Sequence, residues 1–522
     1  IDTELIAQAR AALAATPFPQ RVYERLKRQG VGDFPEFKIT NVGGPATGTA
    51  FTRTSNKPLS EGVPGFFSFN AYYKGVYLQL DGLIKELADE EVWVLGIRNS
   101  ENAKRATDVI GRESLAQEVK RLYLIDYANT WEGSVNDLTL KRGTSLNETM
   151  AISRLLTAAS TARPFAERLH WFWANHFTVS LAKGATRGLV GAFERDAIRP
   201  HIAGRFEDLL WASTTHPAML RYLDNQQSAG PHSRAVALIA RRARRDDETP
   251  RITGLNENLA REVLELHTLG VHGGYSQADV TAFAAVLTGW RVAARSDATA
   301  LPFDAGWHEP GRKTLLGHSY GEGPQALRAV LADLARHPST ARFLATKLAR
   351  HFVADEPPPA LVDRLAARYL RSDGQLADVY RELIASPEAW AEPAAKLKTP
   401  EEFVVSTARV LSLGRVEAGA ARLPAMLVAG MQALGQRPQA APSPAGWPDR
   451  AEDWLGPEAL WKRLEWASRL GDRLGSRIDA RELAARCLGP RLGATTRQQI
   501  ERAADGAQAL ALLLMAPEFQ RR

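Results

Sequence analysis

The 522-residue chain contains a single cysteine, Cys487, which excludes an internal disulfide and any CxxC metal or redox site. We expect a buried structural thiol there, because its neighbours Leu483, Ala484 and Leu488 are apolar. No run of about 18 uncharged apolar residues occurs, so the sequence predicts no membrane-spanning segment. A signal peptide is not read at Ile1, since no charged-then-apolar leader follows it.

Signatures of nucleotide and nucleic-acid binding are also missing. Neither a GxxxxGK[ST] loop nor a strand-anchored GxGxxG is present. The net charge of +7 permits binding to nucleic acid or anionic lipid, yet the arginines are scattered among carboxylates over most of the chain. The densest basic run, Arg241–Arg245, is followed at once by Asp246, Asp247 and Glu248, and this pattern predicts a solvated loop. We therefore expect no nucleic-acid partner.

The composition is that of a globular protein with a mainly α, multi-helical fold. With 45% apolar and 24% charged residues, the chain can bury sizeable cores and form two or more domains. Residues 34–70 are expected to hold a small β-containing patch, with strands at Phe37–Val42 and Thr49–Arg53 between glycines and prolines. Helices are expected at Tyr73–Glu91 and Ser114–Leu138. No alternation of strands and helices indicates a parallel sheet.

Residues 1 to about 160 carry short segments in a characteristic order. These are Arg21-Val-Tyr-Glu-Arg-Leu26, Val63-Pro-Gly-Phe-Phe67, Tyr72-Tyr-Lys-Gly75, Trp93-Val-Leu-Gly96 and Leu122-Tyr-Leu-Ile-Asp-Tyr127. In order and spacing they resemble IcmF-type type VI secretion proteins. The resemblance implies the periplasmic portion of an inner-membrane scaffold that couples a secretion baseplate to an outer-membrane lipoprotein, and it implies no chemistry. It predicts a periplasmic or cell-envelope location, with other type VI secretion envelope components as partners of residues 1–160.

From Thr161 onward the motifs change. The later segments include Trp171-Phe-Trp-Ala-Asn-His-Phe177, Glu265-Leu-His-Thr-Leu-Gly270, Leu287-Thr-Gly-Trp290, Lys347-Leu348 and Ala445-Gly-Trp-Pro448. They resemble the bacterial domain-of-unknown-function family numbered 1800.

The two resemblances predict four regions. Residues 1–160 form an IcmF-like fragment, and residues 161–417 form the helical core of the second family. Residues 418–449 are rich in Ala, Gly and Pro and predict a loop or linker, and residues 450–522 form a C-terminal helical part. Each resemblance covers part of its family, so a natural gene fusion, a recombination product, an assembly error and a designed chimera all stay open.

His176 is the first candidate catalytic residue. It shares one helical stripe with Phe172 and Trp173, in a helix beginning near Pro164, so its imidazole is expected to be partly buried. With Asn175 as a neighbouring binding residue, His176 would be an acid, base or ligand in a pocket. The alternative is a hydrogen-bonded core histidine, which the apolar surroundings favour.

Glu167 and His170 precede it at the i, i+3 spacing that carboxylate-bridged di-iron bundles use twice. No second Glu-x-x-His occurs in the chain, so a surface pair is the favoured interpretation.

A second candidate is the helix expected from Asn256 to about Leu269, with Asn256 as its N-cap. One stripe of this helix carries two candidate catalytic carboxylates and two candidate binding residues: Glu262, Glu265, Asn258 and Arg261. The cluster would hold a divalent metal or supply an acid and a base to a polar substrate. The favoured alternative is a buried ion network that orients helices.

His308 is a further candidate binding residue, in a loop with Asp304 and Glu309. Just beyond, Gly317-His-Ser-Tyr-Gly321 matches the Gly-x-Ser-x-Gly elbow that would make Ser319 a nucleophile, but the surrounding glycines favour a chance match.

The leading functional hypothesis is a bipartite envelope protein, with an IcmF-like scaffold fragment joined to an uncharacterised helical domain. The alternative is an extracytoplasmic enzyme in residues 161–522, a hydrolase or a metal-dependent oxidoreductase; the sequence does not indicate which metal or cofactor would serve it. The enzyme hypothesis predicts that His176, Glu262 and Glu265 converge on one water-accessible pocket. The scaffold hypothesis predicts exposed apolar surface on residues 1–160.

Overall fold

The computed structural model describes residues 15–43, 47–94, 101–140, 146–246, 254–292, 303–391, 394, 396–412 and 422–522, together with residues 4, 8, 10 and 11. Within them the fold is mainly α-helical with two small two-stranded sheets, which confirms the predicted fold class. The chain divides into two compact units, Ile1–Ser145 and Leu146–Arg522. None of the described helices combines the length and apolarity needed to cross a bilayer.

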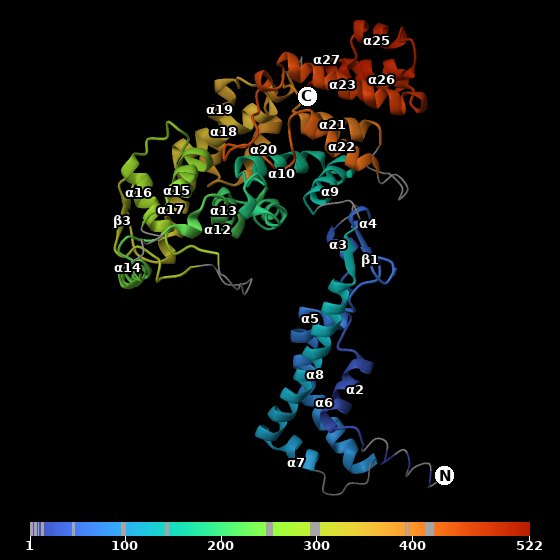
Figure 1. Cartoon of the computed structure of the whole chain (residues 1–522), viewed down its shortest axis with the longest axis vertical. Helices are drawn as coiled ribbons and strands as arrows, with labels where there is room; N and C mark the ends of the chain where they lie inside the picture. Colours follow the sequence, from blue (N-terminus) through green and yellow to red (C-terminus); the bar gives the residue numbers. More distant parts are fainter. Residues whose placement is uncertain are drawn as a thin grey trace. The chain divides into compact units, whose positions relative to one another are not determined.

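The first unit is built around three helices that run side by side (Figure 1): α2 (Phe18–Gln29), α6 (Tyr77–Val94) and α8 (Val109–Asn136). Their facing sides bury Val22, Ile84 and Val119 completely. The shorter elements are α3 (Ile39–Gly43), α4 (Thr47–Ala50), β1 (Phe51–Arg53), η2 (Gly65–Phe67), α5 (Phe69–Ala71), η3 (Tyr72–Val76), α7 (Glu101–Thr107) and β2 (Leu138–Leu140).

Helix α8 is fixed to the irregular segment before α6 by its aromatic residues. The hydroxyl of Tyr123 donates to the carbonyl of Phe66 at 2.7 Å, and Trp131 Nε1 donates to the carbonyl of Phe67 at 2.8 Å. Both carbonyls belong to η2, so the aromatic side chains of α8 also satisfy backbone groups that a helix or strand would otherwise pair.

Strand β1 lies within the predicted range of residues 34–70, its partner β2 lies outside it, and the predicted strand at Phe37–Val42 is wrong. Only Phe37 finds a partner, Val63, and Ile39–Gly43 form helix α3 instead. Without a neighbouring strand, these residues satisfy their backbone groups locally. Of Thr49–Arg53, the last three residues form β1, which pairs antiparallel with β2.

The second unit is a larger helical assembly. Its helices are α9 (Leu146–Ser160), α10 (Pro164–His176), α11 (Val190–Phe193), α12 (Phe206–Thr215), α13 (Pro217–Tyr222), α14 (Arg234–Asp246), α15 (Asn258–Glu262), α16 (Gln277–Leu287), α17 (Pro324–Arg336), α18 (Pro338–Phe352), α19 (Pro359–Arg371), α20 (Leu376–Ala385), α21 (Pro400–Val410), α22 (Arg422–Ala433), α23 (Pro457–Leu474), α24 (Ala480–Leu488), α25 (Ala494–Glu501), α26 (Gly506–Met515) and α27 (Pro517–Gln520). A β-hairpin, β3 (Lys313–Leu315) with β4 (His318–Tyr320), interrupts them.

Proline sets the start of many of these helices, because its missing N–H has no partner in the first turn. The central core of the unit contains Trp173, Phe206, Phe283 and Tyr369, all almost fully buried. The last helices, α23, α25 and α26, group together (Figure 1).

The division between the units falls one helix before the expected junction near Ser160. Helix α9 packs against α21 and α22, and it therefore belongs to the second unit. The change of motif at Thr161 and the division between compact units are thus at different positions.

Residues 418–449, expected as a loop or linker, contain helix α22, and the segment after it is bound to the end of α10. The amide of Leu181 donates to the carbonyl of Gln439 at 2.8 Å. Ser180 Oγ donates to the carbonyl of Ala441 at 2.7 Å. These bonds hold the proline-rich segment within the second unit. Its prolines therefore belong to irregular backbone that is bonded to the rest of the unit, and not to a linker between domains.

Two smaller expectations also differ. The basic run at Arg241–Arg245 lies in helix α14, because Val236, Ile239 and Ala240 give that segment a half-buried helical stripe. Arg241 and Arg242 themselves are exposed. Cys487 is partly exposed on α24, not fully buried.

Candidate functional site

Two neighbouring cavities lie at the C-terminal end of α10. The first, which we call the Arg154 cavity, has among its lining residues Arg154, Trp171, Glu194, Glu401, Gln436 and Gln439. The second, the Lys347 cavity, has among its lining residues Phe172, His176, Lys347, Arg350, Arg450 and Asp453. Both are also lined by Asn175, His351, Trp447, Pro448 and Asp449, which form their common wall.

The common wall is held together by Asn175. Its Nδ2 donates to the carbonyl of Trp447 at 2.9 Å, and its Oδ1 accepts from the amide of Trp447 at 2.8 Å. Gly446 adopts φ +86°, and a Cβ there would lie 2.6 Å from both oxygens of Asn175. Glycine is therefore required for this approach. Asn175, predicted as a binding residue, thus fixes the segment after α22 against α10.

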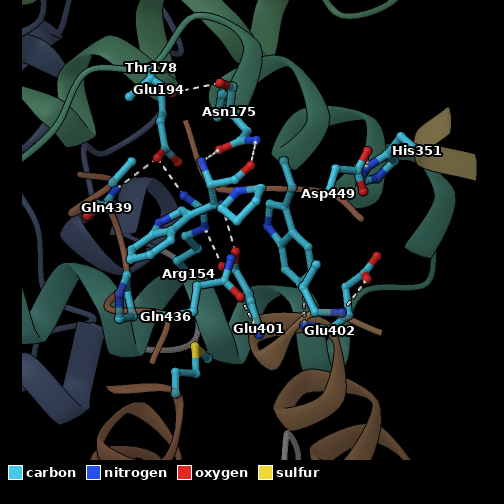
Figure 2. Close-up of a pocket in the computed structure, with 18 of the residues that line it drawn as sticks. Arg154, Asn175, Thr178, Glu194, His351, Glu401, Glu402, Gln436, Gln439 and Asp449 are labelled. Atoms are coloured by element: carbon cyan, nitrogen blue, oxygen red, sulfur yellow. Dashed lines mark hydrogen bonds and ion pairs between the residues drawn. The ribbon is translucent and has the colours of Figure 1, made fainter. Parts of the chain in front are cut away.

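In the Arg154 cavity, Arg154 of α9 lies between two carboxylates (Figure 2). Its Nη1 is 2.6 Å from Glu194 Oε1, and its Nε is 3.1 Å from Glu401 Oε1. Glu194 also accepts from Gln439 Nε2 at 3.0 Å and lies 3.1 Å from His170 Nε2. Glu194 begins the π-helical segment η5 (Glu194–Ile198), and Glu401 is in the first turn of α21.

The two carboxyl groups on this arginine have opposite electrostatic environments. Burial opposes ionisation of Glu194, but Arg154 and the hydrogen bond from His170 outweigh it and lower the pKa of Glu194 to about 2. At Glu401, burial and the nearby Glu194 raise the pKa despite Arg154. One carboxyl is held ionised and the other is biased toward its protonated form, which is the arrangement of an acid beside a base.

Two further carboxylates, Glu402 and Asp449, also line the Arg154 cavity. Glu402 Oε1 is 2.8 Å from Arg522 Nε, and although burial opposes it, this arginine and Arg168 lower the pKa of Glu402 to about 2. Asp449 Oδ2 is 3.3 Å from His351 Nδ1, and the pKa of Asp449 is also lowered, against the effect of burial. These two groups are paired charges of the cavity wall.

In the Lys347 cavity, His176 is 2% exposed and its Nε2 lies 3.1 Å from the carbonyl of His267. Because a carbonyl only accepts, Nε2 carries the proton, and Nδ1 is an acceptor without a hydrogen-bond partner. Burial lowers the pKa of His176 well below its usual value, so the ring is neutral. Burial also lowers the pKa of Lys347, to about 8.

The carboxylates predicted on the Asn256 helix lie elsewhere. Neither Glu262 nor Glu265 is among the residues that line these two cavities, whereas His176 is. Glu265 accepts from the hydroxyl of Tyr275 at 3.3 Å, and the pKa of Glu262 is raised by its burial and by Glu265. The structure therefore does not bring His176 together with the two glutamates in either cavity.

The rest of that helix has a local structural role. Helix α15 begins at Asn258 with Glu257 at its N-cap, so the expected cap at Asn256 is wrong by one position. Asn256 Oδ1 nevertheless accepts from the amide of Asn258 at 3.0 Å. Arg261 is 3.1 Å from Glu257 and 2.9 Å from Gln277, so it joins this helix to α16. From Val263 onward the backbone becomes the π-helix η8 (Val263–Thr268), which disturbs the expected α-helical stripe.

His308 is buried, not available on the loop surface. Its Nδ1 donates to the carbonyl of Thr288 at 2.8 Å, so its Nε2 accepts, from the amide of Gly323 at 3.1 Å. The ring thereby ties two loops together. Ser319 lies in the antiparallel strand β4, with Oγ accepting from Arg312 Nε at 3.1 Å, and not at a strand-to-helix elbow.

The expected surface pair Glu167 and His170 is also buried, at 9% and 1% exposure. Glu167 Oε1 accepts from Arg199 Nη1 at 2.7 Å, and His170 binds Glu194. The expectation was wrong because α10 is covered on nearly every side. Among the described residues, no group of three or more His, Cys, Asp or Glu side chains is arranged to hold a metal ion.

The sequence interpretation missed Arg154, Glu194 and Glu401 as site residues. Glu194 stands in a charged stretch with Arg195 and Asp196, and Glu401 follows Pro400 beside Glu402, so neither glutamate carries a local signal of burial. Lys347 and Trp447 could have been singled out as site residues from the sequence, because both lie in segments that carried the family resemblance.

Comparisons with known proteins agree with both resemblances. A family model described as "Protein of unknown function (DUF1800)" matches residues 75–521, beginning well before Thr161. Over 170 residues the chain is 34% identical to "Type VI secretion system component TssM1" of Pseudomonas aeruginosa, a match that covers 32% of this chain and 14% of TssM1. No solved structure matches the chain.

Proposed function

The chain belongs to the DUF1800 family of proteins of unknown function, and on that premise we propose that it is a bipartite protein of the cell envelope. Its first unit would be an interaction module for type VI secretion components, as the partial similarity to TssM1 suggests. Its second unit would be a helical domain that offers a polar site for a small molecule. The proposed location is the periplasm or the cell envelope.

The observation that carries the proposal is exposed apolar surface on the first unit. Trp93 at the end of α6 is 83% exposed, and Ile110 at the start of α8 is 81% exposed. Helix α7 contacts both α6 and α8, so the two side chains lie on elements joined through one short helix. Exposed large apolar side chains grouped on neighbouring elements mark interaction sites more often than single ones do.

The test compares the full chain with the double variant Trp93→Ser/Ile110→Ser in a bacterium that assembles a type VI secretion system. The wild-type chain is expected in the envelope fraction and to co-purify with components of that system. The double variant is expected to fold normally, because both side chains are exposed, and to lose co-purification. The control Trp461→Ser removes a tryptophan of the second unit that is 66% exposed. Equal co-purification of all three proteins, or none with wild type, would reject the proposal.

A second candidate function is favoured by the Arg154 cavity. Glu194 and Glu401 both contact Arg154, yet the pKa of Glu194 is lowered and the pKa of Glu401 is raised. Such a pair of carboxyl groups is suited to general acid–base catalysis. The function would be hydrolysis of a small polar substrate, with Glu401 donating a proton to the leaving group and Glu194 accepting one from water. His176 would be a supporting residue of the adjoining cavity.

The enzyme hypothesis is tested by screening the purified full chain against ester, amide and glycoside substrates. Glu401→Gln and Glu194→Gln are expected to lower any turnover by about a hundredfold or more. Glu262→Gln is the matched control, since that carboxylate lines neither cavity. Turnover that is unchanged in Glu401→Gln and Glu194→Gln would place the chemistry elsewhere.

A further inference from the structure

The Lys347 cavity carries one uncompensated positive charge. Among its lining residues the basic ones are Lys347, Arg350 and Arg450, and the acidic ones are Asp449 and Asp453. The histidines that line it, His176 and His351, have pKa values lowered by burial and are neutral. The cavity therefore contains charged groups of both signs, and their partners show which charge is uncompensated.

The two arginines have partners in the protein. Arg350 Nε donates to the carbonyl of Asp355 at 3.2 Å. Arg450 lies 3.1 Å from Glu356 and 3.4 Å from Glu452. Their charges are therefore directed to groups outside the cavity.

Lys347 has no such partner. Its Nζ makes no hydrogen bond to any residue that the structure describes, and it lies 5.5 Å from the ring centre of Phe343. The acidic group whose charge acts on Lys347, Asp449, already has His351 Nδ1 at 3.3 Å and Lys396 Nζ at 3.4 Å. An ammonium group in such surroundings is costly unless an anion accompanies it.

Apolar residues also line this cavity. Phe172, Ala445, Trp447 and Pro448 line the same cavity. Its volume of about 260 Å³ is slightly below the roughly 300 Å³ at which pockets for drug-sized ligands begin. The space thus fits a small molecule that has one charged end and one apolar end.

We infer that the Lys347 cavity binds a small monocarboxylate, whose carboxylate accepts a hydrogen bond from Lys347 Nζ and whose apolar part lies against Phe172 and Trp447. A single negative charge matches the single unpaired ammonium group, whereas a phosphate dianion would leave an excess negative charge in a partly buried site. The inference is independent of the proposed partners of the first unit and of chemistry in the Arg154 cavity.

Calorimetric titration of the full chain tests the inference with three probes: butyrate, butylamine and inorganic phosphate. Butyrate is expected to bind, and the other two are expected to bind at least about tenfold more weakly. Lys347→Met is expected to weaken butyrate binding at least about tenfold, because a charge-assisted hydrogen bond is lost. Lys462→Met, on the exposed face of α23, is expected to bind butyrate as wild type does.

A measurement without any variant keeps the test decisive if Lys347→Met fails to fold. In the wild-type chain, butyrate is expected to protect Lys347 from acetic anhydride, with the modified lysines read by mass spectrometry. Equal affinity for butyrate and butylamine, or no protection of Lys347, would overturn the inference. Preference for phosphate over butyrate would overturn the monocarboxylate assignment.

Discussion

Asn175 holds Trp447 by both of its backbone polar groups, with one hydrogen bond of 2.9 Å to the carbonyl and one of 2.8 Å from the amide. The two residues are 272 positions apart in the chain. Together with the bonds from Leu181 and Ser180, this contact holds the segment after α22 against the end of α10 and forms the common wall of both cavities. Asn175 itself belongs to neither charged cluster.

Replacing Asn175 by alanine is expected to destabilise the protein by about 2–4 kcal/mol, because the half-buried amide and carbonyl of Trp447 lose their partners. Hydrogen exchange at residues 445–449 is expected to accelerate more than elsewhere. Chemical denaturation measures the first effect, and exchange read by mass spectrometry measures the second.

The matched control is Asn225→Ala. Asn225 is also buried and donates to the carbonyls of Leu287 and Trp290 at 3.1 and 2.9 Å. We expect a comparable loss of stability without local acceleration at residues 445–449. If both variants change exchange there equally, Asn175 has no special role in the common wall.

Gly446→Ala is expected to destabilise the protein by at least about 2 kcal/mol, since alanine is strained at positive φ and its Cβ would meet the oxygens of Asn175. Gly184→Ala is the control, because a Cβ there has open space around it. Thermal unfolding of both variants is the measurement. A neutral Gly446→Ala would mean that the segment is free to move away from α10.

Arg154→Met is expected to cost about 3–5 kcal/mol, because removing the arginine leaves the buried Glu194 without its main counter-ion. Urea denaturation at neutral pH measures the loss. Arg195→Met serves as the control, since Arg195 is exposed and pairs only with its neighbour Asp196, so a change of less than about 1 kcal/mol is expected there. Similar losses for both variants would contradict the importance of the cavity network.

The low pKa values of Glu194 and Glu402 predict acid sensitivity. A carboxyl whose pKa is about 2 in the folded state and about 4.3 in the unfolded chain stabilises the fold above the higher value. That stabilisation is lost as the pH falls from about 4.3 toward 2. Glu401, whose pKa is raised, contributes oppositely, and its stabilisation is lost as the pH rises above its unfolded value.

Unfolding measured across this acidic range is expected to show a steeper loss of stability for wild type than for Glu402→Gln. The glutamine cannot ionise, so it removes one of the two titrating groups. Identical pH profiles for the two proteins would show that Glu402 does not hold a lowered pKa.

The sequence predicted the fold class because helical periodicity and helix-starting prolines are local signals. It predicted the burial of His176 for the same reason, since this residue lies on the aromatic stripe of α10. It did not predict the partners of that helix. The contacts of Asn175 with Trp447, and of Arg154 with Glu401, join segments hundreds of residues apart, and no local pattern encodes such pairings.

The Asn256 helix shows a different limit. The grouping of Glu262 with Arg261 assumed a regular α-helix, but the backbone changes to a π-helix at Val263 and the arginine binds Glu257 and Gln277 instead. A π-helical segment has no clear signature in one sequence, so the position of Glu265 relative to Glu262 could not be predicted from α-helical spacing.

The central claim is that the first unit docks onto type VI secretion components. Site-specific photo-cross-linking from position 93 of the full chain, in cells that assemble the system, tests it most directly. The claim predicts a cross-link from position 93 to an envelope component of that system and none from position 390, where the exposed Trp390 lies in the second unit. The absence of that cross-link, or its equal appearance from both positions, would contradict the claim.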